Sequence, residues 1–139
     1  MRSFASDNNS GASPEIVRAV AAANEGHAVG YGDDPWTERA RSLFKREFGP
    51  EAEAFFVLNG TGANVLALSL AAGPSTCVLC AEGAHIDVDE TGAPEAAGIK
   101  VVPLAARLGK LEPEALREAL GALGNVHAAQ PSCLSISQP

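Results

Sequence analysis

The chain has 139 residues, enough for one domain with its own core, and 46% of them are hydrophobic. Its formal net charge of −7 argues against nucleic acid or an anionic membrane surface as the main partner. No apolar run reaches the length of about 18 residues that a membrane span needs, and the N-terminus lacks the apolar segment of a signal peptide. Three cysteines, an odd number, favour a reduced, cytoplasmic protein over a disulfide scaffold.

Residues 1–50 predict a polar arm followed by two helices. The arm covers residues 1–12. Ser13 is a typical N-cap for a helix that we expect to stop at Gly26. Asp34 opens a second helix, whose apolar residues recur at helical spacing as far as Phe48. A proline follows each cap, as is common at the first helical position.

Residues 51–139 predict an α/β domain with a mainly parallel sheet. Apolar runs and helical patterns alternate, and this order is typical of strands joined by crossover helices. The last run ends without a helix to cover it, so we expect an incomplete, truncated domain. The predicted strands are 54–58, 77–81, 100–105, a run at 126–130 and 132–139; the predicted helices are 63–72, 85–97 and 113–123.

A glycine-bearing turn, Asn59-Gly60-Thr61-Gly62, joins the first predicted strand of this domain to the helix that follows. A helix that opens from such a turn points unpaired N–H groups and the positive end of its dipole at one spot. Phosphate or carboxylate binds well at such a spot. A tight turn without any ligand explains the pattern equally well.

The sequence after the strand at 77–81 is AHIDVDETG, which holds one histidine and three acids. Ligands of open α/β sheets bind at the carboxyl ends of the strands, so we expect His85 to lie beside the Gly60 turn. Asp87 and Asp89 are expected to be structural or surface groups, because acids are favoured near a helix start. The same residues could instead form a metal site, with His127 as a further ligand.

Other candidate residues are less specific. Cys77 and Cys80 form a CxxC, but residues three apart in a strand point to opposite faces, so we expect two ordinary buried thiols. His127 follows an apolar residue at another predicted strand end. Tyr31 lies in a glycine loop, and Ser6 begins a segment typical of an Asx turn.

Taken together, these segments resemble the N-terminal part of the threonine aldolase family. The matching pieces, in order, are SDN, YGDDPWT, NGTGAN, AHIDVDETGAPE, GKL and VH…QPSCLSISQP. The resemblance implies part of the large domain of a fold type I enzyme that depends on pyridoxal 5′-phosphate. It also implies cleavage of L-threonine or L-allo-threonine to glycine and acetaldehyde, by a cytoplasmic homodimer or homotetramer.

The resemblance also implies roles for individual residues. Gly60 and Thr61 would hold the cofactor phosphate, and His85 would stack on the pyridine ring. His127 would lie near the substrate hydroxyl as a base, and Glu90 would steer hydrogen bonds in the pocket. The remaining implied contacts are Ser6 with the substrate carboxylate and Tyr31 as pocket lining.

One departure from the family is decisive. The lysines present, Lys45, Lys100 and Lys110, do not occupy the family's Schiff-base motif. We therefore expect an N-terminal fragment that is inactive by itself, and marginally stable because its sheet has an exposed edge. The alternatives are a metal-dependent hydrolase that uses His85 and the neighbouring aspartates, and a non-catalytic aldolase-like remnant.

Overall fold

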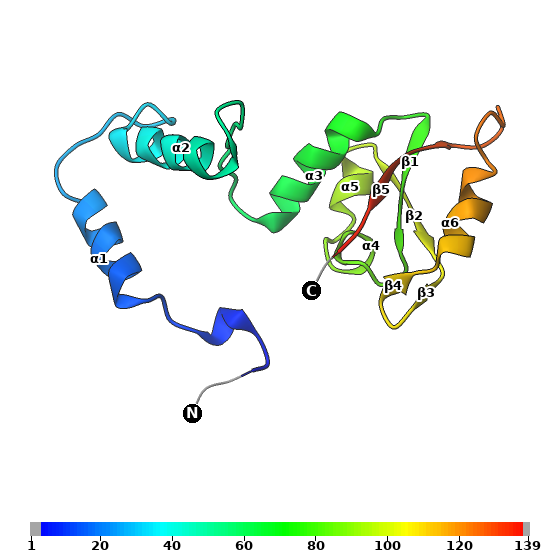
Figure 1. The fold of residues 1–139 in the computed structure, drawn as a ribbon, viewed down its shortest axis with the longest axis horizontal. Helices are drawn as coiled ribbons and strands as arrows, with labels where there is room; N and C mark the ends of the chain where they lie inside the picture. Colours follow the sequence, from blue (N-terminus) through cyan, green and yellow to red (C-terminus); the bar gives the residue numbers. More distant parts are fainter. Residues whose placement is uncertain (1–3, 138–139) are drawn as a thin grey trace. The chain divides into compact units, whose positions relative to one another are not determined.

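The computed structural model describes residues 4–137 (Figure 1). The chain divides into two compact units, Met1–Phe55 and Phe56–Pro139, and each is described by itself. No helix within the described range is long and apolar enough to cross a membrane. The first unit contains a short 3-10 helix, η1 (Asp7–Asn9), and the α-helices α1 (Pro14–Ala23) and α2 (Pro35–Phe48).

Both predicted helix starts in the first unit are confirmed. The side-chain oxygen of each N-cap residue accepts a hydrogen bond from the backbone N–H three residues further along the chain. The distance is 3.4 Å for the Ser13 hydroxyl and 2.8 Å for Asp34 Oδ1. Helix α1 ends at Ala23, ahead of the predicted stop at Gly26, which takes the left-handed backbone (φ 76°) of the turn that follows. Neither helix has a buried residue.

The second unit is a three-layer α/β arrangement, which confirms the predicted parallel sheet with crossover helices. Its main sheet has three parallel strands in the order β2-β1-β5, and β3 and β4 form a small antiparallel ribbon. The elements of this unit are α3 (Gly60–Ala71), β1 (Thr76–Ala81), α4 (His85–Val88), α5 (Ala93–Ala96), β2 (Lys100–Leu104), β3 (Ala106–Arg107), β4 (Lys110–Leu111), α6 (Pro113–Leu120) and β5 (Gln130–Ser135).

Helices α3, α4 and α5 lie on one side of the sheet (Figure 1), and the core is packed between them and the sheet. Val78 and Cys80 of β1 point into this core. Burial raises the pKa of the Cys80 thiol to about 11, with a smaller contribution from nearby acids. Leu68, Ile86 and Ile99 complete the buried cluster.

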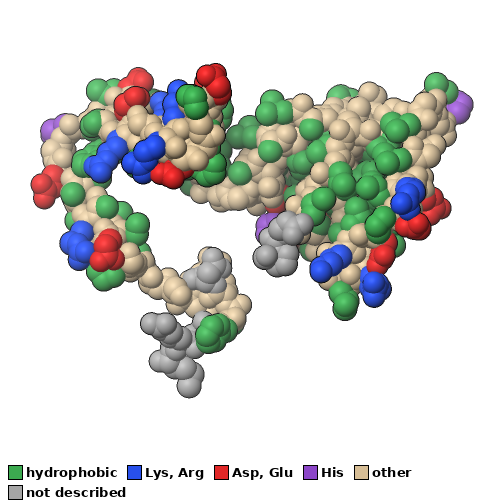
Figure 2. Space-filling view, in the orientation of Figure 1, with side chains coloured by type: hydrophobic (Ala, Val, Ile, Leu, Met, Phe, Trp, Pro, Cys, Tyr) green, Lys and Arg blue, Asp and Glu red, His purple; other side chains and the backbone are tan. Residues whose placement is uncertain are grey.

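The opposite face of the sheet is turned toward α6. Cys77 and Leu79 lie on it, and Figure 2 shows hydrophobic side chains spread over the sheet and α6 in this view. Because Cys80 belongs to the core on the other face, the two thiols diverge, as predicted from their odd spacing. Both are free and buried.

The predicted strand at 54–58 does not form. This segment is irregular, and no strand among the described residues pairs with it. A strand requires a neighbouring strand to accept its hydrogen bonds, which an apolar run cannot supply alone. The following helix starts at Gly60 rather than Ala63, because the Asn59 side chain caps it.

The segment 126–130 does not form a strand of its own, because residues 126–129 are a turn and Gln130 already belongs to β5. Asn125 Oδ1 accepts the His127 N–H at 3.0 Å, which holds a local turn. The Gln130 side chain then donates to the carbonyl oxygens of Asn125 and Ala128, both at 2.9 Å. Strand β5 therefore begins only at Gln130, beside Thr76 at the start of β1.

Candidate functional site

Helix α3 begins with two backbone amides that are free to bind a ligand. Asn59 Oδ1 accepts the Gly62 N–H at 2.8 Å, and Ala63 N–H makes the first intrahelical bond, to the Asn59 carbonyl. The N–H groups of Gly60 and Thr61 have no hydrogen-bond partner within residues 4–137. A Cβ added at Gly60 would meet no neighbouring atom within 4 Å, so there is open space beside this residue. Two free amides at the positive end of a helix dipole favour an anion.

His85 is held at the carboxyl edge of the sheet by the turn that follows β1. Gly83 takes a left-handed backbone (φ 75°), and its N–H donates to Asp87 Oδ2 at 3.1 Å. The adjacent Ile86 is buried in the core and anchors α4. The His85 side chain is 57% exposed. The expectation that Asp87 is a structural group is thus confirmed.

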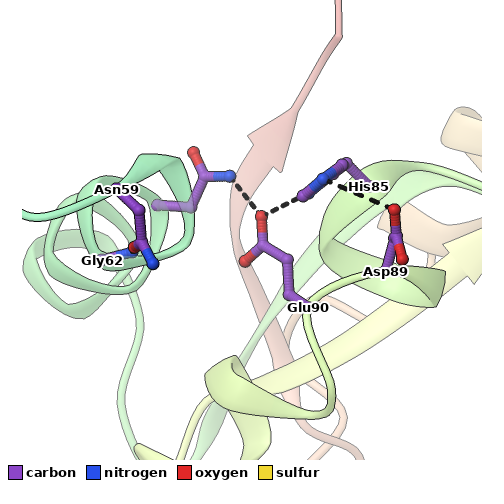
Figure 3. A network of polar contacts seen from close by, with 6 residues as sticks. Asn59, Gly62, His85, Asp89 and Glu90 are labelled. Atoms are coloured by element: carbon purple, nitrogen blue, oxygen red, sulfur yellow. Dashed lines mark hydrogen bonds and ion pairs between the residues drawn. The ribbon is translucent and has the colours of Figure 1, made fainter. Parts of the chain in front are cut away.

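Glu90 connects His85 to helix α3. Its side chain is fully buried, and its Oε1 lies 2.7 Å from His85 Nδ1 and 2.5 Å from Asn64 Nδ2. Figure 3 shows the Glu90 carboxylate between the His85 ring and the helix that carries Asn59 and Gly62. Its other oxygen, Oε2, has no partner among the described residues. The three side chains form one polar network in an otherwise apolar region.

This network places His85 near the N-terminus of α3. Residues four apart in a helix lie on the same face, so Gly60 lies one turn above Asn64. Asn64 contacts Glu90, which in turn contacts His85. The predicted proximity of the Gly60 turn and His85 at this edge of the sheet is therefore supported by a continuous chain of contacts.

Asn64 is the member of the network that the sequence reasoning missed. It is a polar side chain in a helix that is apolar from Val65 to Leu68, and it follows the glycine turn by one helical turn. A single amide in that position is a signal for a buried polar contact. Its partner, Glu90, is 26 residues away in sequence, so the contact itself could not be predicted.

His127 does not lie with His85. The turn that carries His127 precedes β5, and the start of β5 pairs with the start of β1. His85 follows the end of β1, so the two histidines lie at opposite edges of a parallel sheet. The expected strand end at His127 is therefore wrong. His127 instead lines a hollow of about 630 Å³ with Lys100 and residues of α6.

Ser6 and Tyr31 belong to the first unit, and their expected contacts with substrate stay predictions. The Ser6 hydroxyl accepts the Asn8 N–H at 3.2 Å, which is the local turn suggested by the sequence. Tyr31 is fully exposed and has a left-handed backbone (φ 63°), an uncommon conformation for a tyrosine. Such outliers are frequent in binding loops.

The alternative of a metal-dependent hydrolase finds no support in the geometry. Across the described part of the chain, no three His, Cys, Asp or Glu side chains come together as metal ligands. The Asp87 carboxylate already accepts a hydrogen bond from the Gly83 N–H. His85 Nε2 and Asp89 Oδ2 are 3.8 Å apart, beyond hydrogen-bond distance, and both side chains are exposed.

Two curated proteins are similar to this chain over nearly its whole length. A low-specificity L-threonine aldolase from Pseudomonas sp. (strain NCIMB 10558) is 43% identical over 137 residues, which cover 97% of this chain and 40% of the relative. The Pseudomonas aeruginosa protein of the same name is 42% identical over the same span. The chain thus spans about 40% of the length of these curated relatives.

The fold prediction is confirmed by a solved structure. A threonine aldolase from Leishmania major matches with a TM-score of 0.85 and 34% identity, over 94% of this chain and 38% of that one. It shares the fold type I architecture that the sequence motifs indicated. The sequence profile of the beta-eliminating lyases matches residues 3–138. This chain therefore belongs to the beta-eliminating lyase family, and within it is similar to the low-specificity L-threonine aldolases.

Proposed function

We propose that this chain forms the phosphate-binding and ring-binding part of a pyridoxal 5′-phosphate-dependent lyase of the threonine aldolase type. The observation that carries the proposal is the junction between the α3 N-terminus and His85, joined through Asn64 and Glu90. This junction supplies an anion site and a flat, exposed ring at the same edge of the sheet. The identity of 42–43% with L-threonine aldolases supports the assignment.

The residues present fit the two ends of the cofactor. The free amides of Gly60 and Thr61 would donate to phosphate oxygens, and the Thr61 hydroxyl would add a further donor. The helix dipole would stabilise the phosphate charge without a basic side chain, so the negative net charge of the chain is no obstacle. The exposed His85 imidazole offers a flat face for the pyridine ring.

The proposed reaction is the cleavage of the Cα–Cβ bond of L-threonine or L-allo-threonine to glycine and acetaldehyde. The bound cofactor supplies an electron-withdrawing ring that accepts the electron pair of the broken bond. Ser6 and Tyr31 remain the proposed substrate-side residues, for carboxylate binding and pocket lining. The homo-oligomer and the cytoplasmic location are part of the same proposal. His127 is left out, because it lies at the opposite edge of the sheet.

We also infer that these 139 residues alone do not catalyse the cleavage. Lys45 is in the last turn of α2, Lys100 begins β2, and Lys110 is in the β3-β4 ribbon. Within the second unit, neither Lys100 nor Lys110 makes a hydrogen bond or ion pair with His85 or Glu90 among the described residues. Covalent attachment of this cofactor requires a lysine. Incubation of the purified chain with L-threonine should therefore release glycine at the background rate only.

The phosphate site is tested by removing one amide proton while keeping the helix. Gly60→Pro does this, because proline is favoured at the first position of a helix and the extended Asn59 (φ −156°, ψ 176°) tolerates a following proline. We expect the variant to bind pyridoxal 5′-phosphate about 10- to 100-fold more weakly, the loss typical of one hydrogen bond to a charged group. Equilibrium dialysis measures the affinity.

Gly60→Ala is the matched control, since it adds a side chain into open space and keeps the N–H. It should bind the cofactor as the parent chain does. Pyridoxal without its phosphate should bind the three proteins equally. The proposed site is wrong if the proline and alanine variants have equal affinity for the phosphorylated cofactor, or if the parent chain does not bind it.

A further inference from the structure

Glu90 is an unusual residue to find where it is. Among the described residues, Glu90 is the one charged residue that is buried, with 2% of its surface exposed. Burial of a carboxylate is unfavourable unless hydrogen bonds replace the lost water. Its two partners, Asn64 and His85, both contact Oε1, and Oε2 is left without one. Both hydrogen bonds therefore meet at one oxygen, which links the Asn64 and His85 side chains through a single atom.

The chemistry of the contact determines the protonation of His85. A carboxylate in its ionised form can only accept hydrogen bonds, so with that form of Glu90 the 2.7 Å contact places the proton on His85 Nδ1. In the neutral ring, Nε2 is then the nitrogen with the free electron pair. The carboxylate of Asp89, at 3.8 Å from Nε2, is too distant for a hydrogen bond. Nε2 therefore remains open to solvent or ligand.

Asn64 holds the carboxylate in place from the other side. Its Nδ2 lies 2.5 Å from the same Oε1, so its amide donates and its orientation is determined by the contact. Because Asn64 lies in α3, one turn below Gly60, the orientation of the His85 ring is tied to the helix whose N-terminus carries the free amides. An exposed imidazole without such an anchor would rotate about its side-chain bonds.

We propose that Glu90 is a positioning residue, which holds His85 with its proton on Nδ1 and couples the ring to helix α3 through Asn64. The use of the ring rests on the proposed function, in which it lies against the cofactor. The positioning of the ring does not depend on the proposed function, because it follows from two contacts within this chain. A ring in one orientation would present the same face to every ligand molecule.

The protonation of His85 can be read directly by NMR of the 139-residue chain labelled with ¹⁵N-histidine. At about pH 9, where an unperturbed imidazole is neutral, two-bond ¹H–¹⁵N correlations distinguish the protonated nitrogen from the bare one. We expect Nδ1 of His85 to carry the proton. His27 and His127 are internal controls, since their rings have no hydrogen-bond partner among the described residues. They should show the tautomer mixture of a free imidazole.

Two variants separate positioning from simple packing. Glu90→Leu fills the space without an acceptor, so His85 should change to the mixture shown by His27 and His127. Glu90→Gln retains an acceptor oxygen and should keep part of the Nδ1–H preference. Backbone amide signals of β1 report whether each variant is folded. The proposal is overturned if the parent His85 resembles the two controls, or if a folded Glu90→Leu chain keeps the parent tautomer.

Ligand binding distinguishes this inference from the proposed function. Glu90→Leu should bind pyridoxal 5′-phosphate more weakly than the parent but bind inorganic phosphate equally, because the α3 amides are unchanged. Equal loss for both ligands would contradict an effect through the ring. A parent chain with the Nδ1–H tautomer and no affinity for pyridoxal 5′-phosphate would refute the proposed function and leave the positioning role intact.

Discussion

The core of the second unit is small, so a single truncation should have a large effect. Ile99 is 2% exposed and belongs to a cluster of five buried residues on one face of the sheet. Ile99→Ala removes three carbon atoms, a loss of about 2.5 kcal/mol at roughly 0.8 kcal/mol for each buried CH₂. The cavity that remains adds to this, so we expect a total of about 3–5 kcal/mol.

Leu70→Ala is the matched control for this prediction. It also removes three carbon atoms, but Leu70 is 92% exposed, so the change should stay within about 0.5 kcal/mol. Leu70 lies in helix α3, where alanine is a good helix former, and Ile99 lies outside any helix. Helix propensity therefore does not contribute to the difference between the two variants.

Amide hydrogen exchange of Val78 and Leu79 is the suitable assay, because the tryptophan and the tyrosine are both in the first unit and do not report on the second. Under conditions where exchange follows the opening equilibrium, these amides should exchange at least about 100-fold faster in Ile99→Ala, or lose protection altogether. If the Ile99 and Leu70 variants exchange at the same rate, the second unit does not depend on this core.

Two further predictions concern titratable groups. Ellman's reagent at about pH 8 should modify Cys133 before Cys80, because burial raises the pKa of Cys80 to about 11, and mass spectrometry of partly modified chain identifies the site. The hydrogen bonds from the Thr37 side chain and N–H lower the pKa of Asp34 below its ordinary value of 3.8. Its capping contribution is therefore present above that pH and is lost as the pH falls through the lowered pKa. The Thr37 amide signal should therefore shift during acid titration of the parent and stay level in Asp34→Asn; a level signal in both would contradict the cap.

Features that depend on residues close in sequence were predictable. Ser13 and Asp34 cap their helices through a backbone N–H three residues away, so the helix starts could be placed from the sequence. The divergence of Cys77 and Cys80 follows from strand geometry alone. The position of His85 beside the α3 turn follows from the rule that ligands of parallel sheets bind at the carboxyl edge.

Features that depend on distant partners were decided only by the tertiary structure. The apolar segment 54–58 has the composition of a strand but no described strand to pair with. Residues 126–129 are held as a turn by the side chain of Gln130, the first residue of β5. His127 consequently lies at the opposite edge of the sheet from His85. The contact between Asn64 and Glu90 joins residues 26 positions apart. Local sequence determines helix caps and strand faces because their partners are neighbours, whereas a buried carboxylate acquires its partners only when the sheet brings α3 and α4 together.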